Sequence, residues 1–246
     1  MHYYRFLFVA VAMACLGVGC SRTATTIQSS QPEQAIPETR TVAPINASEA
    51  IVRIRSEKGE WCGTGFVVET DSDNRRATIW TCGHVVGTDK RVIIDWQSQN
   101  RTGSGVVVRA KVEGQIDFAE VIAEYPGKNP PPVCSINTAG MAAGSTGFGL
   151  GHAGCTWMAG GPIRVRPESY RGGLIPFDPP FNKGASGGPI FDAHGDVTGI
   201  ITYRTTVPGQ SAYGLAGPVA QGLFELASIR DGELPDGIQR LGDAGE

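Results

Sequence analysis

The chain has 246 residues, a formal net charge of −3, and enough apolar side chains, 41% of the total, for a sizeable core. This length suits one domain of roughly 200 residues, or two at most. The slightly negative charge argues against nucleic acid as a partner, because phosphates usually require a basic surface. The 34 glycines are about twice the average usage. Together with many short runs rich in valine and isoleucine, they predict an all-β fold and exclude a coiled coil or helical bundle.

The N-terminus has the pattern of a targeting segment. An apolar run over residues 6–19 follows Arg5 and ends at Cys20. It is shorter than the ~20 residues that span a bilayer, and it matches the hydrophobic region of a signal peptide. Residues 16–21 (LGVGCS) resemble a bacterial lipobox, with Gly17 where an aliphatic residue is usual. We therefore predict a lipoprotein-type signal peptide over 1–20 and a lipid on Cys20. Ordinary cleavage and a retained anchor are the alternatives, and all three place the folded part outside the cytoplasm.

Two polar segments flank the predicted folded domain, which covers residues 48–229. Residues 21–47 are dominated by Ser, Thr, Gln and Pro, which predicts a flexible tether from the membrane lipid to the domain. Residues 230–246 are again polar and glycine-rich, and we expect a loosely ordered tail.

Between these segments, short apolar runs separated by turn residues predict strands. They occupy 51–55, 65–69, 77–81, 91–96, 105–112, 118–124, 144–150, 163–167, 189–192, 197–203 and 212–218. Only residues 219–229 have helical spacing. The prolines at 130–132 divide the strands into six before and about five after. Two small barrels, side by side in one compact unit, are the natural interpretation.

The first motif with chemical potential is Gly-Ala-Ser-Gly-Gly-Pro-Ile at residues 184–190. Glycines on both sides of Ser186 permit a tight turn that exposes its hydroxyl and lets backbone N–H groups converge on an oxyanion. For this string alone, an ordinary glycine-rich hairpin is the alternative. Since a strand and two further motifs accompany it, we interpret Ser186 as a candidate nucleophile.

The second motif is an apolar strand that runs into a turn carrying His84, an arrangement suited to a general base. His152 and His194 lie in glycine-containing loops and lack this strand-to-turn setting. The third motif is Asp117 at the start of an apolar strand. This carboxylate could orient the His84 imidazole if it is buried beside it. Asp95 is its main rival, and a turn-capping role is the alternative for Asp117.

Together these motifs resemble the trypsin-like (chymotrypsin-fold) serine proteases, and among them the bacterial HtrA/Deg-type branch. The likeness extends over about residues 48–229 and preserves the order His84, Asp117, Ser186. It is carried by residues 63–68 (GTGFVV), 81–86 (TCGHVV), 117–119 (DFA), 184–189 (GASGGP), 199–201 (GII) and 213–219 (YGLAGPV).

The resemblance implies two six-stranded antiparallel β-barrels packed side by side, a C-terminal helix, and a catalytic triad at the seam. In it, His84 is the general base, Asp117 its orienting partner and Ser186 the nucleophile. The N–H groups of Gly184 and Ser186 form the oxyanion hole, and Thr202 supports Asp117. The expected activity is serine endopeptidase action on protein or peptide substrates, with no cofactor.

The resemblance also implies a substrate pocket. An alignment with the family places Pro180 at the pocket floor, where no carboxylate would attract Lys or Arg. Phe181 would narrow the pocket and favour small or medium apolar side chains, although a one-residue slip of the alignment would move Phe181 off the wall. The implied substrate-binding residues are Phe181, Lys183, Thr202, Tyr203, Arg204 and Gly214.

Several residues depart from the family pattern. Ala185 stands before the nucleophile in place of the usual Asn or Asp, and Cys82-Gly83 replaces the usual Ala-Ala before His84. No PDZ domain is expected after the protease domain. These departures leave open a catalytically weak binding or scaffold protein of the same fold. An esterase of the α/β-hydrolase type is a poorer alternative, because it requires a helix directly after the serine.

Four cysteines remain after the leader, which allow three disulfide connectivities. The family fold would bring Cys62 and Cys82 near one another, so we favour pairing of Cys62 with Cys82 and of Cys134 with Cys155. Buried free thiols are the alternative. Because CxxC and other metal-ligand spacings are absent from the sequence, no metal is expected.

Overall fold

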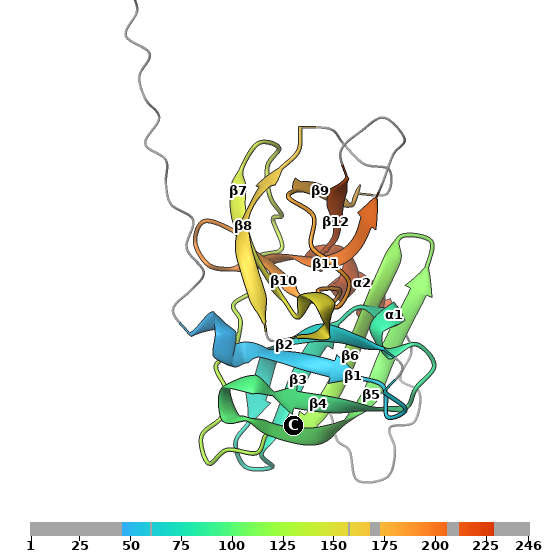
Figure 1. Ribbon diagram of the computed structural model, residues 1–246, viewed down its shortest axis with the longest axis vertical. Helices are drawn as coiled ribbons and strands as arrows, with labels where there is room; N and C mark the ends of the chain where they lie inside the picture. Colours follow the sequence, from blue (N-terminus) through green and yellow to red (C-terminus); the bar gives the residue numbers. More distant parts are fainter. Residues whose placement is uncertain (1–45, 60, 157, 168–172, 206–211, 229–246) are drawn as a thin grey trace, which may run out of the picture. The chain divides into compact units, whose positions relative to one another are not determined.

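The computed structural model describes residues 46–59, 61–156, 158–167, 173–205 and 212–228 (Figure 1). Their antiparallel strands close into two barrels of six strands each. The predicted all-β class and double-barrel architecture are therefore confirmed.

The first barrel has the strand order β1-β2-β3-β6-β5-β4 and closes through the pairing of β1 with β4. Its inward side chains are mostly β-branched or aromatic, such as Phe66, Ile79, Ile94 and Val121, and all four are fully buried. Such side chains pack well on a pleated surface that is buried on one face. The strands are β1 (Ile51–Arg55), β2 (Cys62–Asp71), β3 (Arg76–Thr81), β4 (Arg91–Trp96), β5 (Arg101–Glu113) and β6 (Ile116–Glu124).

The second barrel has the order β10-β11-β12-β9-β8-β7. Its own core cluster includes Ile163, Phe177, Ile190 and Ile201. The strands are β7 (Thr146–Gly151), β8 (Ala159–Val165), β9 (Ile175–Asp178), β10 (Pro189–Phe191), β11 (Val197–Thr205) and β12 (Tyr213–Pro218).

Short helices complete the described chain. They are η1 (Ala47–Ala50), α1 (Gly83–Val86), η2 (Gln97–Gln99), η3 (Ala153–Cys155) and the predicted C-terminal helix α2 (Val219–Ser228). Helix α2 packs against β6 of the first barrel and β11 of the second, as Figure 1 also shows. None of the helices in the described ranges is both long and apolar enough to cross a membrane.

Every predicted strand overlaps an observed one, but the sequence did not indicate β9 or α1. Strand β9 has only four residues, including Pro176, and α1 also has only four residues. Both are too short for a periodic pattern to show. The predicted leader, including Cys20, and the predicted tail lie outside the described residues, as does nearly all of the tether.

Candidate active site

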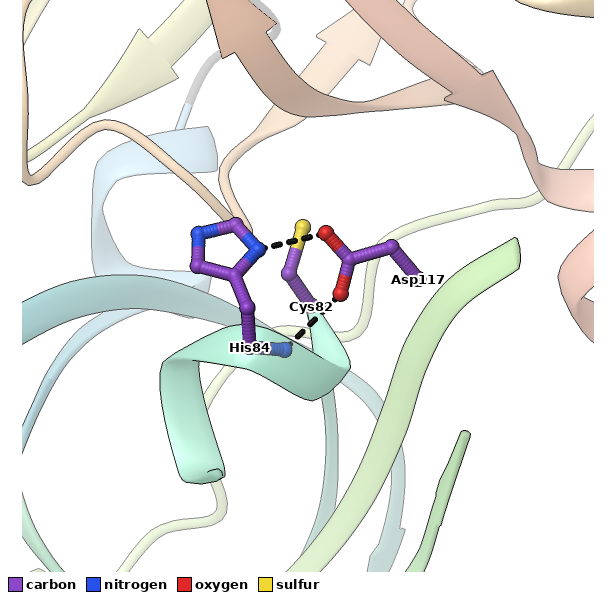
Figure 2. A group of neighbouring side chains, drawn as sticks. All are labelled: Cys82, His84 and Asp117. Atoms are coloured by element: carbon purple, nitrogen blue, oxygen red, sulfur yellow. Dashed lines mark hydrogen bonds and ion pairs between the residues drawn. The ribbon is translucent and has the colours of Figure 1, made fainter. Parts of the chain in front are cut away.

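His84 and Asp117 are brought together by strand register within the first barrel. Strands β3 and β6 are antiparallel, and Thr81 at the end of β3 faces Ala119. Residues just after Thr81 therefore lie beside residues just before Ala119. The His84 Nδ1 atom lies 2.5 Å from Asp117 Oδ2, and the His84 backbone N–H donates to Oδ1 over 2.8 Å (Figure 2). This pair of contacts fixes both the ring and the main chain of His84.

The surroundings of the pair suit an oriented acid–base group. The Asp117 side chain is 1% exposed, whereas that of His84 is 38% exposed. The Tyr203 ring stacks on the imidazole with centroids 5.9 Å apart. Burial and the nearby Asp117 carboxylate raise the pKa of Tyr203, so its hydroxyl stays protonated at neutral pH. The Asp117 carboxylate is thus buried against the N–H groups of His84, while part of the imidazole ring stays accessible to solvent.

Ser186 lies on a tight turn that precedes β10. Gly184 and Gly187 flank it with φ values of 92° and 85°, which a residue with a Cβ rarely adopts. A Cβ at Gly187 would also collide with the Thr64 carbonyl. The Ser186 hydroxyl donates to the Thr202 carbonyl over 3.3 Å. Ser186 and His84 line the same groove.

The peptide units around Ser186 are fixed by their carbonyl groups. The Lys183 carbonyl accepts from the Gly154 N–H over 2.5 Å, and the Ala185 carbonyl accepts from the Gly188 N–H over 2.9 Å. In a trans peptide the N–H points opposite to the C=O. The N–H groups of Gly184 and Ser186 therefore face away from these partners, and neither donates to a backbone carbonyl elsewhere in the described ranges. Two such donors are suited to hold an oxyanion.

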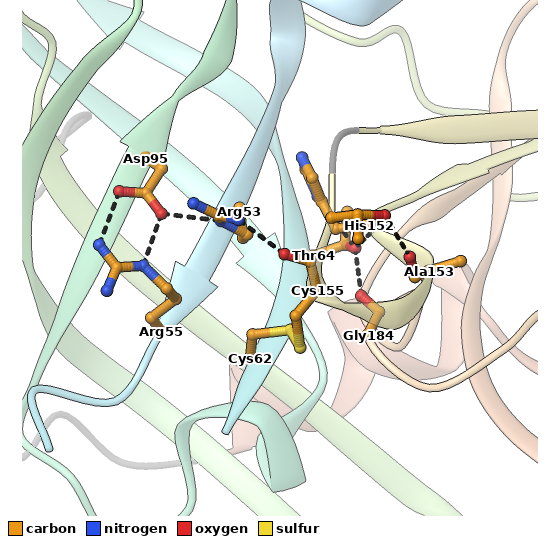
Figure 3. The surroundings of a disulfide bond; sticks show 10 residues. Arg53, Arg55, Cys62, Thr64, Asp95, His152, Ala153, Cys155 and Gly184 are labelled. Atoms are coloured by element: carbon orange, nitrogen blue, oxygen red, sulfur yellow. Dashed lines mark hydrogen bonds and ion pairs between the residues drawn. A yellow bond between two sulfur atoms is a disulfide. The ribbon is translucent and has the colours of Figure 1, made fainter. Parts of the chain in front are cut away.

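Thr64 of β2 ties this turn to the first barrel. Its N–H donates to the Ser186 carbonyl over 2.8 Å, and its Oγ1 donates to the Gly184 carbonyl over 2.7 Å. The same Oγ1 accepts from the His152 N–H over 2.9 Å. The His152 Nδ1 atom lies 3.3 Å from the same oxygen, and since the Thr64 hydroxyl donates to Gly184, a hydrogen bond here requires the tautomer with the proton on Nδ1. Figure 3 shows Thr64, His152 and Gly184 side by side.

His152 is fully buried in this network. Its Nε2 atom has no hydrogen-bond partner among the described residues. Burial, together with the positive charge of Arg53, lowers the pKa of His152 to about 4. The imidazole is therefore neutral near pH 7, and a proton on it would disturb the segment that holds the Ser186 turn.

The disulfide joins Cys62 to Cys155, with the two Cα atoms 5.8 Å apart (Figure 3). Both predicted pairings, Cys62 with Cys82 and Cys134 with Cys155, are wrong. Cys62 begins β2 beside η3 of the second barrel, so it bonds across the two barrels. Cys82 and Cys134 are buried free thiols. Cys82 donates to the Ile201 carbonyl, and the Cys134 N–H donates to the Val67 carbonyl.

The groove beside the candidate triad has a volume of about 510 Å³. Most predicted substrate-binding residues line it, although Gly214 does not. Gly214 lies in β12, where the Phe177 ring covers its Cα. The lining residues are His84, Phe181, Asn182, Lys183, Ser186, Ile201, Thr202, Tyr203 and Arg204.

The predicted role of Thr202 differs from its observed contacts. Its Oγ1 donates to the Ile200 carbonyl over 2.9 Å and accepts from the Gly217 N–H over 3.1 Å. The bond to Ile200 lies within β11, and the bond from Gly217 links β12 to β11. Asp117 receives hydrogen bonds from the ring and the main chain of His84.

Asp95, the rival carboxylate, has a structural role. It bridges β1 and β4 by accepting from Arg53 and Arg55 at 2.8 and 2.6 Å. Burial alone would raise the pKa of Asp95, but hydrogen bonds from Arg55, Thr102 and Arg53 outweigh it and lower the pKa to about 2. This carboxylate stabilises the first barrel.

The sequence did not reveal one cluster of side chains that could act as metal ligands. Donor atoms of Cys82, His84 and Asp117 all lie within 4.8 Å of one another, and Figure 2 shows the Cys82 thiol beside the His84–Asp117 contact. Burial raises the pKa of Cys82 well above its ordinary value, so the thiol is protonated. The sequence signal that could have indicated this cluster is Cys82 placed two residues before His84, together with Asp117 near the start of a strand.

Comparison with known proteins supports a peptidase fold. The family described as a trypsin-like peptidase domain matches residues 63–200. A probable periplasmic serine endoprotease, DegP-like, from Pseudomonas putida (strain W619) is 26% identical over 163 residues. That match covers 63% of this chain and 32% of the relative, so the chain spans about one third of the relative's length.

Solved structures share the fold. The inactive form of a mutant Rv3671c from M. tuberculosis H37Rv has a TM-score of 0.58 and 23% identity, and the match covers 76% of this chain and 90% of that one. The serine endoprotease from Yersinia pestis has a TM-score of 0.60 and 21% identity, with 74% and 63% of the two chains covered. The HtrA-type protease AlgW, solved with a tripeptide, has a TM-score of 0.60 and 20% identity, with 75% and 61% covered.

Proposed function

Because this chain belongs to the trypsin-like peptidase family, we propose that it is a serine endopeptidase with a triad of His84, Asp117 and Ser186. The observation that carries the proposal is the double contact of Asp117 with His84, at 2.5 and 2.8 Å, beside a groove that also contains Ser186. An oriented imidazole next to a serine on a glycine turn is the arrangement that acyl transfer requires.

In the proposed mechanism, Ser186 Oγ attacks the carbonyl carbon of the scissile peptide bond. His84 Nε2 takes the hydroxyl proton and later gives it to the leaving amine, while the peptide C–N bond breaks and an acyl-enzyme forms. Water then attacks the ester with the same base and releases the carboxylic acid. Asp117 holds the Nδ1 proton of His84 and so keeps Nε2 available as the acceptor. Ser186 must first rotate from the Thr202 carbonyl toward His84.

The Gly184 and Ser186 N–H groups are the proposed oxyanion hole. The oxygen of the scissile carbonyl becomes negative as the tetrahedral intermediate forms, and fixed donors stabilise that charge. Support comes from the hydrogen bonds that hold the Lys183 and Ala185 carbonyls on the opposite side. These bonds would limit the rearrangement of the two donors during the proposed reaction.

The groove favours an apolar side chain before the cleaved bond. Phe181 packs against Phe177, with ring centroids 6.0 Å apart, and no described lining residue is a carboxylate. A buried Lys or Arg of a substrate would find no partner there, which is costly. We therefore propose substrates with Ala, Val or Leu at this position, selected in a graded manner, since one methylene is worth about 1–3 kcal/mol.

The proposed location is outside the cytoplasm. The P. putida relative is described as probably periplasmic, the N-terminal segment reads as a leader, and a disulfide is consistent with an oxidising compartment. We further propose that a lipid on Cys20 anchors the chain and that residues 21–47 tether the domain to the membrane.

A peptide-library digestion tests the function. The purified protein should cleave within peptides, mainly after small or medium apolar residues, and the Ser186→Ala variant should not. Equal cleavage by both proteins would show that the activity does not depend on Ser186 and would refute the proposal. Dominant cleavage after Arg or Lys would refute the proposed pocket alone.

A further inference from the structure

We propose that Cys82, His84 and Asp117 form an inhibitory site for a thiophilic divalent cation such as Zn²⁺. The inference starts from the Cys82 thiol, a buried group that the proposed peptidase mechanism does not use. Its donor atom and those of His84 and Asp117 lie within 4.8 Å of one another. A thiolate, an imidazole and a carboxylate are a common ligand set for zinc. The inhibitory part of this inference rests on the proposed function.

The spacing of the donors is close to what zinc needs. With Zn–S near 2.3 Å and Zn–N and Zn–O near 2.0–2.2 Å, tetrahedral ligand atoms lie about 3.3–3.6 Å apart. The present His84–Asp117 contact of 2.5 Å would open by about 1 Å, and the sulfur, within 4.8 Å of both ligand atoms, would move closer to them. Both changes need side-chain rotation, and the Cys82 thiol would give up its hydrogen bond to the Ile201 carbonyl.

Charge favours a divalent ion in this buried place. Both Cys82 and the Asp117 side chain are almost fully buried. A thiolate and a carboxylate carry two negative charges, which balance those of Zn²⁺, and the imidazole is neutral. A neutral cluster avoids most of the penalty for burying an unpaired charge. Binding releases one proton, from the thiol, and a water molecule takes the fourth position.

The ion has a route to this site. The His84 side chain is 38% exposed and lines the substrate groove. Rotation of the imidazole about its side-chain bonds would open a path from the groove to Cys82 and Asp117, which lie behind it. A substrate in the groove would hinder that rotation.

Occupancy would switch off the proposed base. A metal on Nδ1 displaces the proton that Asp117 now holds, and that proton moves to Nε2. An imidazole with a protonated Nε2 cannot accept the proton of Ser186. The metal also takes Asp117 away from the ring. Zinc would thus inhibit without touching Ser186.

Zinc binding by the full chain tests this site, with Cys15 and Cys20 replaced by serine so that they bind no metal. Zinc is titrated against a chromophoric chelator, and the matched variants are Cys82→Ala and Cys134→Ala. Both replaced side chains are buried free thiols. We expect one zinc per chain, unchanged in Cys134→Ala and at least about tenfold weaker in Cys82→Ala. Equal binding by Cys82→Ala, or no binding by the parent protein, would overturn the site.

Inhibition is measured separately on the same proteins. Zinc should block peptide cleavage by the parent protein and by Cys134→Ala at concentrations that leave Cys82→Ala active. Equal inhibition of all three proteins would place the inhibitory ion elsewhere. If none of the proteins cleaves peptides, the chelator titration still decides the metal site, so failure of the proposed function is distinguishable from failure of this one.

Discussion

The two halves of the candidate active site are held in different ways. The His84–Asp117 pair is fixed inside the first barrel, where the register of β3 and β6 brings together residues 33 positions apart. The Ser186 turn belongs to the second barrel but is held by Thr64 of the first and by the loop that the Cys62–Cys155 disulfide fastens. The His84–Asp117 pair, the acid–base half of the site, should therefore tolerate substitutions where the two barrels pack together. The Ser186 turn, the oxyanion half, should not.

The largest expected effect tests both halves at once. Ser186→Ala and His84→Ala should each lower kcat by about 10³–10⁶, and the double variant should be little worse, because the residues act as a unit. Initial-rate measurements on one peptide substrate give these values. Additive losses in the double variant would show that the two residues do not work together.

Asp117→Asn tests the acid–base half alone. An amide at this position cannot hold His84 in the tautomer with a free Nε2, so kcat should fall by about 10⁴. The fold should remain, because the side chain keeps its shape. The circular dichroism spectrum and the rate are the measurements. As a control, Asp95→Asn should lower stability and leave kcat nearly unchanged, since Asp95 bridges β1 and β4. A large loss of kcat in Asp95→Asn with normal kcat in Asp117→Asn would contradict the assignment of Asp117 as the partner of His84.

The pH dependence of stability tests the link between the barrels. The pKa of His152 is about 4 in the folded chain against an ordinary 6.5, so the unfolded chain binds the proton first as the pH falls. Its contribution to stability is therefore full above about pH 6.5 and is lost toward pH 4. Between pH 7 and pH 4.5 the free energy of unfolding should fall by about 2 kcal/mol from this group.

Urea unfolding of the parent protein and of His152→Gln measures that loss. The variant should be less sensitive to pH over this range, because glutamine does not titrate. His194→Gln is the matched control and should keep the sensitivity of the parent. An unchanged pH dependence in His152→Gln would contradict a neutral His152 in the network.

Removal of the disulfide should lower catalysis less than the triad substitutions do, and it should affect only the Ser186 turn. Without the Cys62–Cys155 bond, the Gly154 N–H holds the Lys183 carbonyl less firmly, and the Gly184 donor loses its fixed direction. Loss of one complete oxyanion donor costs about 10²–10³ in kcat, so a loosened donor should cost about tenfold, with KM little changed. Rates of Cys62→Ala/Cys155→Ala should be compared with Cys134→Ala well below the unfolding temperature. A changed KM with normal kcat would contradict this.

The same contrast explains what the sequence could predict. The strand pattern, the double barrel and the proximity of His84 to Asp117 depend on local alternation and on register within one barrel. The disulfide was predicted wrongly because Cys62 and Cys155 meet only where the barrels pack together, which no local pattern encodes. Likewise, the Thr64 bonds to the Ser186 turn and the burial of His152 follow from barrel packing. The sequence did not point to the proposed zinc ligands, because two of them are the expected triad residues His84 and Asp117 and the third is a single cysteine.

Labelling with a fluorophosphonate tests the central claim, that Ser186 is an activated nucleophile, most directly. The probe should add once to the folded parent protein, and peptide mapping should locate the adduct on Ser186. His84→Ala and the urea-unfolded parent should remain unlabelled, because the hydroxyl is activated only in the assembled site. No adduct on the folded protein, or an adduct on another residue, would contradict the account.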